Sequence, residues 1–287
     1  MRTTSCLRIE AHAKINWCLS VTGRTENGYH LLDMLMQRVS LYDTLFAAPS
    51  DRLSLHVIGQ EVTGPEEDNL VLKAARALQA YRPQAEARLT LVKRIPQGAG
   101  MGGGSSDAAA ALKLLTRLWE LRLSPAELSA IALKLGADVP FFLNGRPARI
   151  RGIGEQLSPV FLPAGVPLVL VKATEGLNTG RVYGRSDALP AAPVDVDSLL
   201  PLLSAGDLKA AARVTGNSLY PAAVSLCPKL EQIKNAVHAS GASYVLMTGS
   251  GAVVYGAYGT SAQAAEAEKQ LKAVFPDAFV SRAETVS

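Results

Sequence analysis

Residues 96–107 read Pro-Gln-Gly-Ala-Gly-Met-Gly-Gly-Gly-Ser-Ser-Asp, and an amphipathic stretch, residues 108–121, follows directly. Upstream, residues 88–95 begin with alternating apolar and polar side chains, a pattern typical of a β-strand. A glycine-rich loop therefore leads from a strand into a helix, which Ser105 or Ser106 is expected to cap. Helix N-termini attract anions, and glycines let the backbone approach an anion closely. The stretch predicts a phosphate-binding loop.

Two standard phosphate-binding motifs fit this loop poorly. Gly98, Gly100 and Gly103 satisfy G-x-G-x-x-G, but a dinucleotide-binding fold also needs an acidic residue about twenty positions further on, after a second strand. A helix is expected there instead. The P-loop spacing matches Gly98 and Gly103, but Gly104 stands where the motif requires lysine. The loop therefore indicates a phosphate site of another kind.

The loop resembles the central motif of the GHMP kinase superfamily, in which a proline and a glycine-serine loop open a helix without a motif lysine. The resemblance implies that ATP is the co-substrate, together with Mg²⁺. It implies that ATP contacts Pro96, Gln97, Gly98, Ala99, Gly100, Met101, Gly102, Gly103, Gly104, Ser105 and Ser106. Asn69, at the start of an expected helix reaching residue 81, would lie near the adenine; a plain helix N-cap is an equally good interpretation.

The N-terminal region contains motifs that narrow the resemblance to one kind of GHMP kinase. It contains Ala-Lys-Ile-Asn at 13–16, Thr-Gly-Arg at 22–24 and Asn-Gly-Tyr-His at 27–30. The Asn-Gly pair is also a strong signal for a tight hairpin turn. Together these motifs resemble the GHMP kinases that phosphorylate the 2-hydroxyl of a cytidine-diphosphate-linked branched polyol, in the non-mevalonate route to isoprenoid precursors.

The resemblance also implies residues that bind this small-molecule substrate. Tyr29 would stack on the cytosine, His30 would contact the base edge, and Asn16 would lie close to Lys14. The segment Thr-Gly-Arg-Val-Tyr at 179–183 resembles a threonine-containing segment that ends in an aromatic residue. Thr179 would therefore belong to the substrate site, and Tyr183 would stack on the other face of the base.

Residues 136–142 read Gly-Ala-Asp-Val-Pro-Phe-Phe and resemble the segment that holds the catalytic aspartate in this superfamily. The resemblance implies that Asp138 orients the substrate hydroxyl and accepts its proton. Lys14 would neutralise charge at the transferred phosphoryl group and stand in for the absent P-loop lysine. In a plainer interpretation, Asp138 only caps a short helix that begins near Val139; both interpretations can hold together.

Two other functions stay open. A GHMP kinase for another small alcohol, such as homoserine or a mevalonate derivative, would share the loop, but the Asn-Gly-Tyr-His segment argues against it. A noncatalytic nucleotide- or RNA-binding module is the third candidate, because the N-terminal half of the superfamily shares its fold with ribosomal-type domains. Lys14 and Asp138, together with the loop, disfavour that candidate.

The order of elements predicts an α+β, two-domain chain. The resemblance implies an ATP-binding domain, residues 1–155, with a ribosomal-protein-S5-domain-2-like fold. Residues 156–287 show the β-α-β-β-α-β order of a ferredoxin-like domain, with an inserted helical segment at 198–214. The turn Thr-Gly-Ser-Gly at 248–251 resembles the third GHMP motif, which is expected to pack near the glycine loop, although an ordinary hairpin turn fits nearly as well.

Composition indicates a globular protein without a membrane span. Hydrophobic residues make up 48% and charged residues 19% of the chain, and no apolar run approaches the roughly 18 residues that would cross a bilayer. The three cysteines and four histidines show no metal-ligand spacing, so we expect no protein metal site and a cytoplasmic location. The net charge of +4 is too dispersed for nucleic acid and suits anionic small molecules. We expect a monomer or homodimer.

Overall fold

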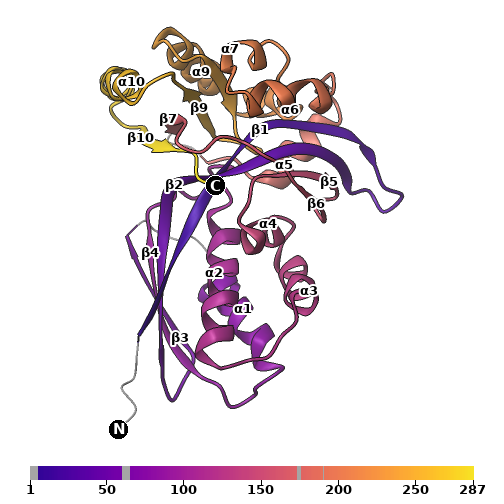
Figure 1. Ribbon diagram of the computed structural model, residues 1–287, viewed down its shortest axis with the longest axis vertical. Helices are drawn as coiled ribbons and strands as arrows, with labels where there is room; N and C mark the ends of the chain where they lie inside the picture. Colours follow the sequence, from indigo (N-terminus) through magenta and orange to yellow (C-terminus); the bar gives the residue numbers. More distant parts are fainter. Residues whose placement is uncertain (1–5, 60–64, 173–175, 190) are drawn as a thin grey trace. The chain divides into compact units, whose positions relative to one another are not determined.

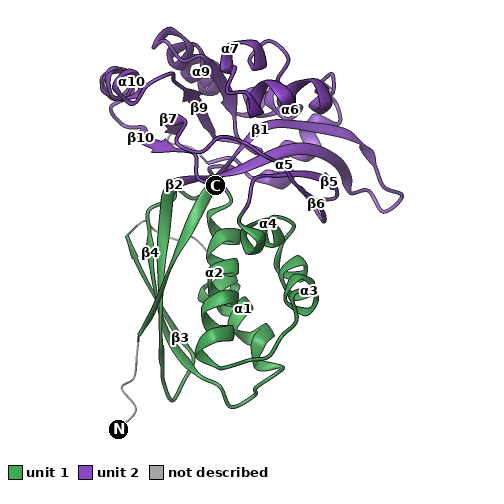
Figure 2. Cartoon of the chain, viewed as in Figure 1, with its two compact units in different colours: residues 1–13, 41–97, 102–145 green, residues 14–40, 98–101, 146–287 purple. Residues whose placement is uncertain are grey.

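The computed structural model describes residues 6–59, 65–172, 176–189 and 191–287 (Figure 1). The described chain mixes helices with strands and divides into two compact units (Figure 2). Unit 1 holds the described residues of 1–13, 41–97 and 102–145, and unit 2 holds those of 14–40, 98–101 and 146–287. The units interleave along the chain, and the division into domains 1–155 and 156–287 stays a prediction.

The first two strands form a long hairpin. β1 (Leu7–Arg24) pairs with β2 (His30–Pro49), and each strand contributes one end to unit 1 and the other to unit 2. In the turn between them, the Thr25 N–H donates to the carbonyl oxygen of Tyr29 (2.8 Å). Gly28 takes a positive φ of 83°, which a residue without a Cβ adopts readily. A hairpin turn at this point is confirmed, but it is not a two-residue Asn-Gly turn, because residues 25–29 separate the strands and Asn27 does not take a positive φ.

Unit 1 combines a sheet with helices. β3 (Ser54–Gly59) runs parallel to β4 (Ala87–Lys93), and β4 pairs antiparallel with residues 44–49 of β2. The helical elements are η1 (Glu66–Asp68), α1 (Leu70–Gln79), α2 (Gly103–Leu118), α3 (Pro125–Leu135) and α4 (Val139–Asn144). Figure 1 shows α1, α2 and α3 to one side of β3 and β4. Alternate side chains of β4 are buried, because successive residues of a strand face opposite ways.

Helix α2 begins earlier than the sequence predicted. It starts at Gly103 and ends at Leu118, whereas the expected range was 108–121. Gly102 occupies the N-cap position in the left-handed conformation, with φ at 69°. The expected cap by Ser105 or Ser106 is therefore wrong, since both lie in the first helical turns. A glycine enters the left-handed region without the strain of a side chain, so the chain can turn into the helix at Gly102.

Unit 2 contains an antiparallel sheet with the strand order β10-β7-β9-β8. The strands are β7 (Pro167–Lys172), β8 (Tyr244–Met247), β9 (Val253–Ala257) and β10 (Phe279–Glu284). Helix α9 (Lys229–Ala239) precedes β8, and α10 (Ser261–Val274) joins β9 to β10. This order and topology are those of a ferredoxin-like domain, so the prediction for the C-terminal half is confirmed.

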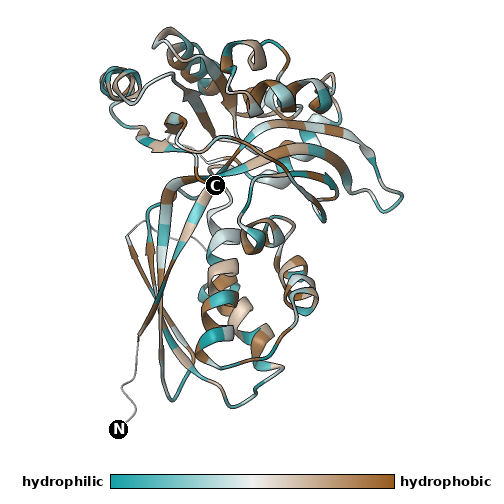
Figure 3. Ribbon diagram, in the orientation of Figure 1, coloured by the Kyte–Doolittle hydropathy of each residue, from teal (hydrophilic) through white to brown (hydrophobic). Residues whose placement is uncertain are grey.

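Unit 2 contains further elements, which come before this sheet in the sequence or between its first two strands. β5 (Ala148–Gly152) pairs with residues 32–36 of β2, and β6 (Gln156–Pro159) pairs with β5. The segment between β7 and α9 contains α5 (Thr179–Ser186), α6 (Val196–Ser204), α7 (Leu208–Ala211) and α8 (Tyr220–Leu226). The predicted insertion at 198–214 corresponds to α6 and α7. Hydrophobic and hydrophilic residues alternate along the helices and strands (Figure 3), as expected when each element buries one face.

Candidate active site

Residues 98–101 of the glycine loop are held by the turn between β8 and β9. The Ala252 N–H donates to the carbonyl oxygen of Gly98 (3.2 Å), and the Thr248 hydroxyl donates to that of Gly100 (3.3 Å). A Cβ on Gly100 would lie 2.2 Å from the Thr248 carbonyl oxygen, and its φ is 70°, so only glycine fits. The predicted packing of this turn near the glycine loop is confirmed.

Lys14 and Asn16 connect β1 to the same loop and turn. The Lys14 ammonium donates to the side-chain oxygen of Asn16 (2.6 Å), and that oxygen also accepts from the Gly249 N–H (2.9 Å). The Lys14 N–H donates to the carbonyl oxygen of Met101 (3.0 Å). Lys14 is 3% exposed and Asn16 is fully buried. The predicted proximity of Asn16 to Lys14 is confirmed, and the Asn16 amide oxygen fixes the lysine.

Asn217 holds the turn from another segment, and sequence reasoning did not assign it a role. Its side-chain nitrogen donates to the carbonyl oxygens of Met247 and Gly249, both at 2.8 Å. Both bonds satisfy main-chain groups of the turn that packs on the glycine loop. Asn217 therefore supports the loop indirectly, and its position far along the chain from residue 98 explains why no local pattern indicated this.

Within unit 1, the N-terminus of α2 gathers segments that are distant in sequence. A Cβ on Gly104 would lie 3.6 Å from the Leu70 side chain at the start of α1. A Cβ on Gly136 would lie 3.9 Å from the Ser105 hydroxyl, and Gly136 precedes Asp138 by two residues. The starts of α1 and α2 and the turn into α4 therefore meet. Gly104 and Ser105, in the first turn of α2, lie on this contact.

Asn69 and Asp138 occupy the helix ends at this point. The Asn69 side chain accepts the Val71 N–H (2.9 Å), which confirms the N-cap interpretation; its contact with adenine stays a prediction. Asp138 occupies the N-cap position of α4, but its side chain makes no capping hydrogen bond. Its backbone is already helical (φ −83°, ψ −14°), whereas a capping residue normally has extended backbone. The expectation of a capping side chain is wrong, and the catalytic role stays a prediction.

A buried group of charges adjoins the start of α2, and sequence reasoning missed it. The Lys93 ammonium lies 2.7 Å from Asp107 and also contacts Asp43, and these side chains are at most 8% exposed. A Cβ on Gly103 would lie 3.4 Å from the same ammonium. The only sequence signal was a lysine at a position of β4 where the alternation calls for a buried residue. The cluster fixes α2 to β4 and β2.

Burial controls protonation in this cluster. It raises the pKa of Asp107 to about 7, Asp43 adds to the rise, and Lys93 opposes it. Burial alone would lower the pKa of Lys93, but Asp107 and Asp43 raise it above its usual value. The other carboxylate oxygen of Asp107, Oδ1, has no hydrogen-bond partner among the described residues. The pKa of Asp107 is therefore raised first by burial of its carboxyl group and then by the second buried carboxylate, Asp43, which shares the same ammonium.

The residues expected to bind cytosine occupy neighbouring positions in unit 2. The ring centroids of His30, at the start of β2, and Tyr183, in α5, lie 4.9 Å apart. Tyr29 precedes His30 in the hairpin turn and is 63% exposed. Thr179 is the first residue of α5, and its hydroxyl shares a hydrogen bond with the Ser250 hydroxyl (2.9 Å). The structure therefore brings His30 and Tyr183 together and joins Thr179 to the turn at 248–251.

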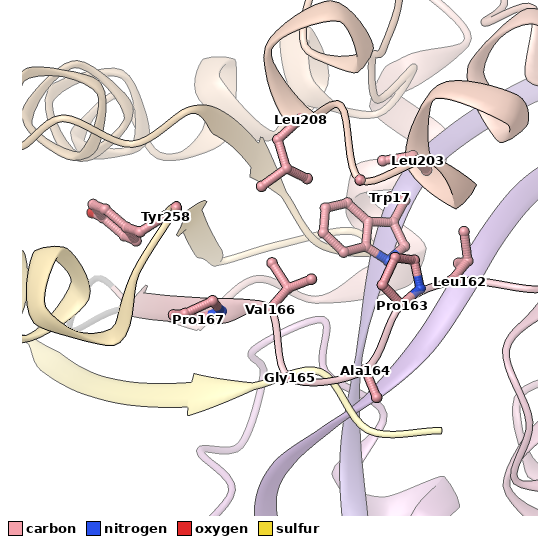
Figure 4. Close-up of a pocket in the computed structure, with 12 residues that line it drawn as sticks. Trp17, Leu162, Pro163, Ala164, Gly165, Val166, Pro167, Leu203, Leu208 and Tyr258 are labelled. Carbon is pink, nitrogen blue, oxygen red and sulfur yellow. The ribbon is translucent and has the colours of Figure 1, made fainter.

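A separate cavity of about 240 Å³ also lies in unit 2 (Figure 4). Apolar side chains line most of it, and Trp17 forms one wall. The Trp17 ring packs edge-on against Tyr244 and Tyr255, with centroids 5.1 and 6.0 Å away. None of the described residues lining the cavity belongs to the predicted site. Trp17 therefore serves packing.

The described part of the chain offers neither a metal site nor a membrane-spanning helix. Across residues 6–59, 65–172, 176–189 and 191–287, no three His, Cys, Asp or Glu side chains form a group suited to a metal ion. None of the described helices has the length and apolar character needed to cross a membrane.

The architecture and the loop define a class of protein. The model for the GHMP kinases N terminal domain matches residues 69–146, and the model for GHMP kinases C terminal matches residues 199–277. Homoserine kinase from Cytophaga hutchinsonii shares the fold: its crystal structure superposes with a TM-score of 0.76 at 16% identity, over 100% of this chain and 96% of that one. GHMP kinases are enzymes that use ATP as co-substrate.

Proteins that are more similar to this chain narrow the class to one family of GHMP kinases. The 4-diphosphocytidyl-2-C-methyl-D-erythritol kinase of Paramagnetospirillum magneticum is 40% identical, over 97% of this chain and 98% of the relative. A crystal structure of 4-(cytidine 5'-diphospho)-2C-methyl-D-erythritol kinase has a TM-score of 0.83 at 36% identity, over 98% of this chain and 100% of that one. This chain therefore belongs to the 4-diphosphocytidyl-2-C-methyl-D-erythritol kinase family of the GHMP kinases.

Proposed function

We propose that this protein transfers the γ-phosphoryl group of ATP to the 2-hydroxyl of 4-diphosphocytidyl-2-C-methyl-D-erythritol, a step of non-mevalonate isoprenoid precursor biosynthesis. The observation that carries this function is the 40% identity, over nearly the full length of both chains, to a kinase named for that substrate. Kinases for homoserine and mevalonate share the fold at 16% and 18% identity, and that likeness reaches no further than the fold.

The glycine loop is the proposed site for the ATP phosphates. Residues 98–101 pack on the turn at 248–251, and residues 103–106 open α2, where the first N–H groups of the helix lack partners within it. The helix dipole adds partial positive charge at this point. Asn69 begins α1 beside the start of α2, which supports its assignment to the nucleoside end of ATP.

For the chemistry, we assign Asp138 and Lys14 the two charged roles. The substrate oxygen forms a bond to the γ-phosphorus, the bond from that phosphorus to the bridging oxygen breaks, and ADP leaves. Asp138 orients the hydroxyl and accepts its proton, and Lys14 stabilises the negative charge on the transferred group. Phosphoryl transfer has a loose transition state, so positioning and charge stabilisation contribute most. The hydrogen bond from Lys14 to Asn16 supplies that positioning for the ammonium.

Tyr29, His30 and Tyr183 form the proposed cytosine slot, and Asn16 and Thr179 complete the proposed substrate site. Mg²⁺ would neutralise charge on the ATP phosphates. It favours oxygen ligands and keeps several waters, so phosphate oxygens suit it better than a cage of protein ligands. A cytoplasmic location, action without nucleic acid, and a monomeric or homodimeric state stay predictions.

The direct test offers the purified protein ATP, Mg²⁺ and the cytidine substrate, and follows the product by ³¹P NMR. A new phosphomonoester signal on the 2-position, with one ADP formed per product, is the expected result. Homoserine and mevalonate serve as competing acceptors in parallel reactions. If either alcohol is phosphorylated faster than the cytidine compound, that alcohol is the substrate and the proposed one is wrong. RNA binding that weakens steeply with salt, without any ATP turnover, would instead favour a binding module.

A further inference from the structure

A titratable cluster holds the ring of His30 at the end of the β1–β2 hairpin. Asp187 follows α5, and its Oδ1 lies 2.8 Å from Nε2 of His30. The other carboxylate oxygen of Asp187 contacts the Arg24 guanidinium. The His30 side chain is 13% exposed, and its ring also packs on Tyr183. All of these residues belong to unit 2.

The contact with Asp187 decides where the imidazole carries its proton. A carboxylate only accepts hydrogen bonds, so an Nε2 to Oδ1 distance of 2.8 Å requires a proton on Nε2. A neutral imidazole has a single N–H, which leaves Nδ1 as an acceptor. The Nε–H of Arg24 also lies 3.3 Å from Nε2 and would favour the opposite tautomer, but that contact is longer than the 2.8 Å contact with the negatively charged carboxylate. The carboxylate therefore fixes the tautomer with an acceptor at Nδ1.

We propose that Asp187 is a positioning residue that makes His30 selective for cytosine over uracil. This rests on the proposed function, in which His30 contacts the edge of the base. Cytosine presents an amino group, a donor, at the position where uracil presents a carbonyl oxygen, an acceptor. An imidazole with an acceptor at Nδ1 can accept a hydrogen bond from the amino group of cytosine. With uracil, Nδ1 would face the carbonyl oxygen, so two acceptors would oppose each other. In the Ser-His-Asp triad of hydrolases an aspartate likewise holds a histidine in one tautomer.

The kinetic test compares the cytidine substrate with its uridine counterpart. In Asp187→Asn, the new amide and Arg24 can both donate to Nε2, which shifts the proton to Nδ1 and removes the acceptor. We expect the preference for cytidine, measured as the ratio of kcat/KM values, to fall by about tenfold or more. The loss should come from a higher KM for the cytidine substrate, with kcat within about threefold of wild type. Asp187→Glu, which keeps the carboxylate, should recover part of the preference.

Asp197→Asn is the matched control. Asp197 is another aspartate of unit 2 that pairs with an arginine, Arg149, at 2.6 Å. Its substitution should leave the base preference at the wild-type ratio. If Asp187→Asn also leaves that ratio unchanged, or lowers kcat equally for both substrates, the residue does not determine specificity and the inference is overturned.

A spectroscopic test reads the tautomer without any substrate. Two-dimensional ¹H–¹⁵N spectra of the free protein, with His30→Gln used to assign the signal, should show the His30 proton on Nε2 in the wild type. It should move toward Nδ1 in Asp187→Asn. A wild-type proton on Nδ1 would overturn the inference even if the kinase activity is confirmed. If the wild type phosphorylates neither the cytidine nor the uridine substrate, both the proposed function and the proposed selectivity are wrong. The spectrum still reports whether Asp187 sets the tautomer of His30.

Discussion

Lys14 and Asn16 stand two residues apart on β1, and the ammonium of the first donates to the side-chain oxygen of the second at 2.6 Å. The same oxygen accepts from the turn at 248–251, which packs on the glycine loop. Asn16 therefore fixes the Lys14 ammonium relative to that turn. In Asn16→Ala this anchor is lost, and a displaced ammonium can cost about a hundredfold in rate. We expect kcat to fall by about tenfold to a hundredfold, with a smaller change in KM for the cytidine substrate.

Steady-state kinetics of Asn16→Ala check this expectation, with urea denaturation of the same variant as the control for folding. A variant that keeps its kcat but binds the cytidine substrate poorly would show that Asn16 acts through the substrate site alone and does not position Lys14.

Asp138 and Lys14 should be needed for turnover more than for ATP binding. Asp138→Asn removes the proton acceptor, and loss of a general base costs about 10²- to 10⁴-fold in rate. Lys14→Met removes the proposed charge at the transferred group and should lower kcat to a similar degree. Calorimetry with a nonhydrolysable ATP analogue should give nearly wild-type affinity for Asp138→Asn. Asp51→Asn, in an exposed loop of unit 1, is the matched control; near-normal turnover of Asp138→Asn would exclude this carboxylate from the mechanism.

The sequence predicted most of the elements that have a local signal. The strand at 88–95, the hairpin turn at Asn27 and Gly28, and the ferredoxin-like order of the C-terminal half all depend on periodicity or turn chemistry within a few residues. The start of α2 was predicted wrongly because serine is a better intrinsic N-cap than glycine. The left-handed backbone of Gly102 decided the outcome, and backbone conformation is not visible in composition.

The site was predictable only where a motif is contiguous. The glycine loop is contiguous, and Asn16 with Lys14 falls within four residues. The contact of Lys93 with Asp43 joins residues 50 positions apart, and that of His30 with Asp187 joins residues 157 positions apart. Such pairs depend on tertiary packing, so one sequence carries no local signal for them. Asp187 in particular belongs to no motif in the sequence.

Gly100 should be intolerant of a side chain because of backbone geometry. Its φ is 70°, and an added Cβ would lie 2.2 Å from the Thr248 carbonyl oxygen, so the loop or the turn must move. We expect Gly100→Ala to lower the free energy of unfolding by about 1–3 kcal/mol. Gly104→Ala is the control for stability, since its Cβ would have no neighbour closer than 3.6 Å. Equal unfolding midpoints in urea for the two variants would contradict the steric argument.

Asp107 should make the stability of the protein depend on pH. Its pKa is about 7 in the folded state against 3.8 for an ordinary aspartate, so the folded protein binds this proton more tightly than the unfolded chain. The stabilisation is complete below about pH 4 and is lost as the pH rises through about 7, by about 1.4 kcal/mol per pH unit within that window. Asp107→Asn carries a neutral group at every pH and should lack this loss.

Urea denaturation of the wild type and Asp107→Asn at intervals from pH 4.5 to 8 checks the expectation. The difference in unfolding free energy should move in favour of the variant as the pH rises. Parallel curves across this range would mean that Asp107 keeps an ordinary pKa in the folded protein.

Tyr29 should contribute binding energy without contributing to the fold. Its side chain is 63% exposed, so Tyr29→Ala should change the free energy of unfolding by no more than about 0.5 kcal/mol. Stacking of a base on an aromatic ring is worth about 1–3 kcal/mol, which corresponds to a rise of about 5- to 150-fold in KM for the cytidine substrate. Tyr81→Ala, at a tyrosine 48% exposed in unit 1, should leave this KM unchanged. If KM stays at the wild-type value in Tyr29→Ala while kcat falls, the ring acts on the chemical step and the cytosine lies elsewhere.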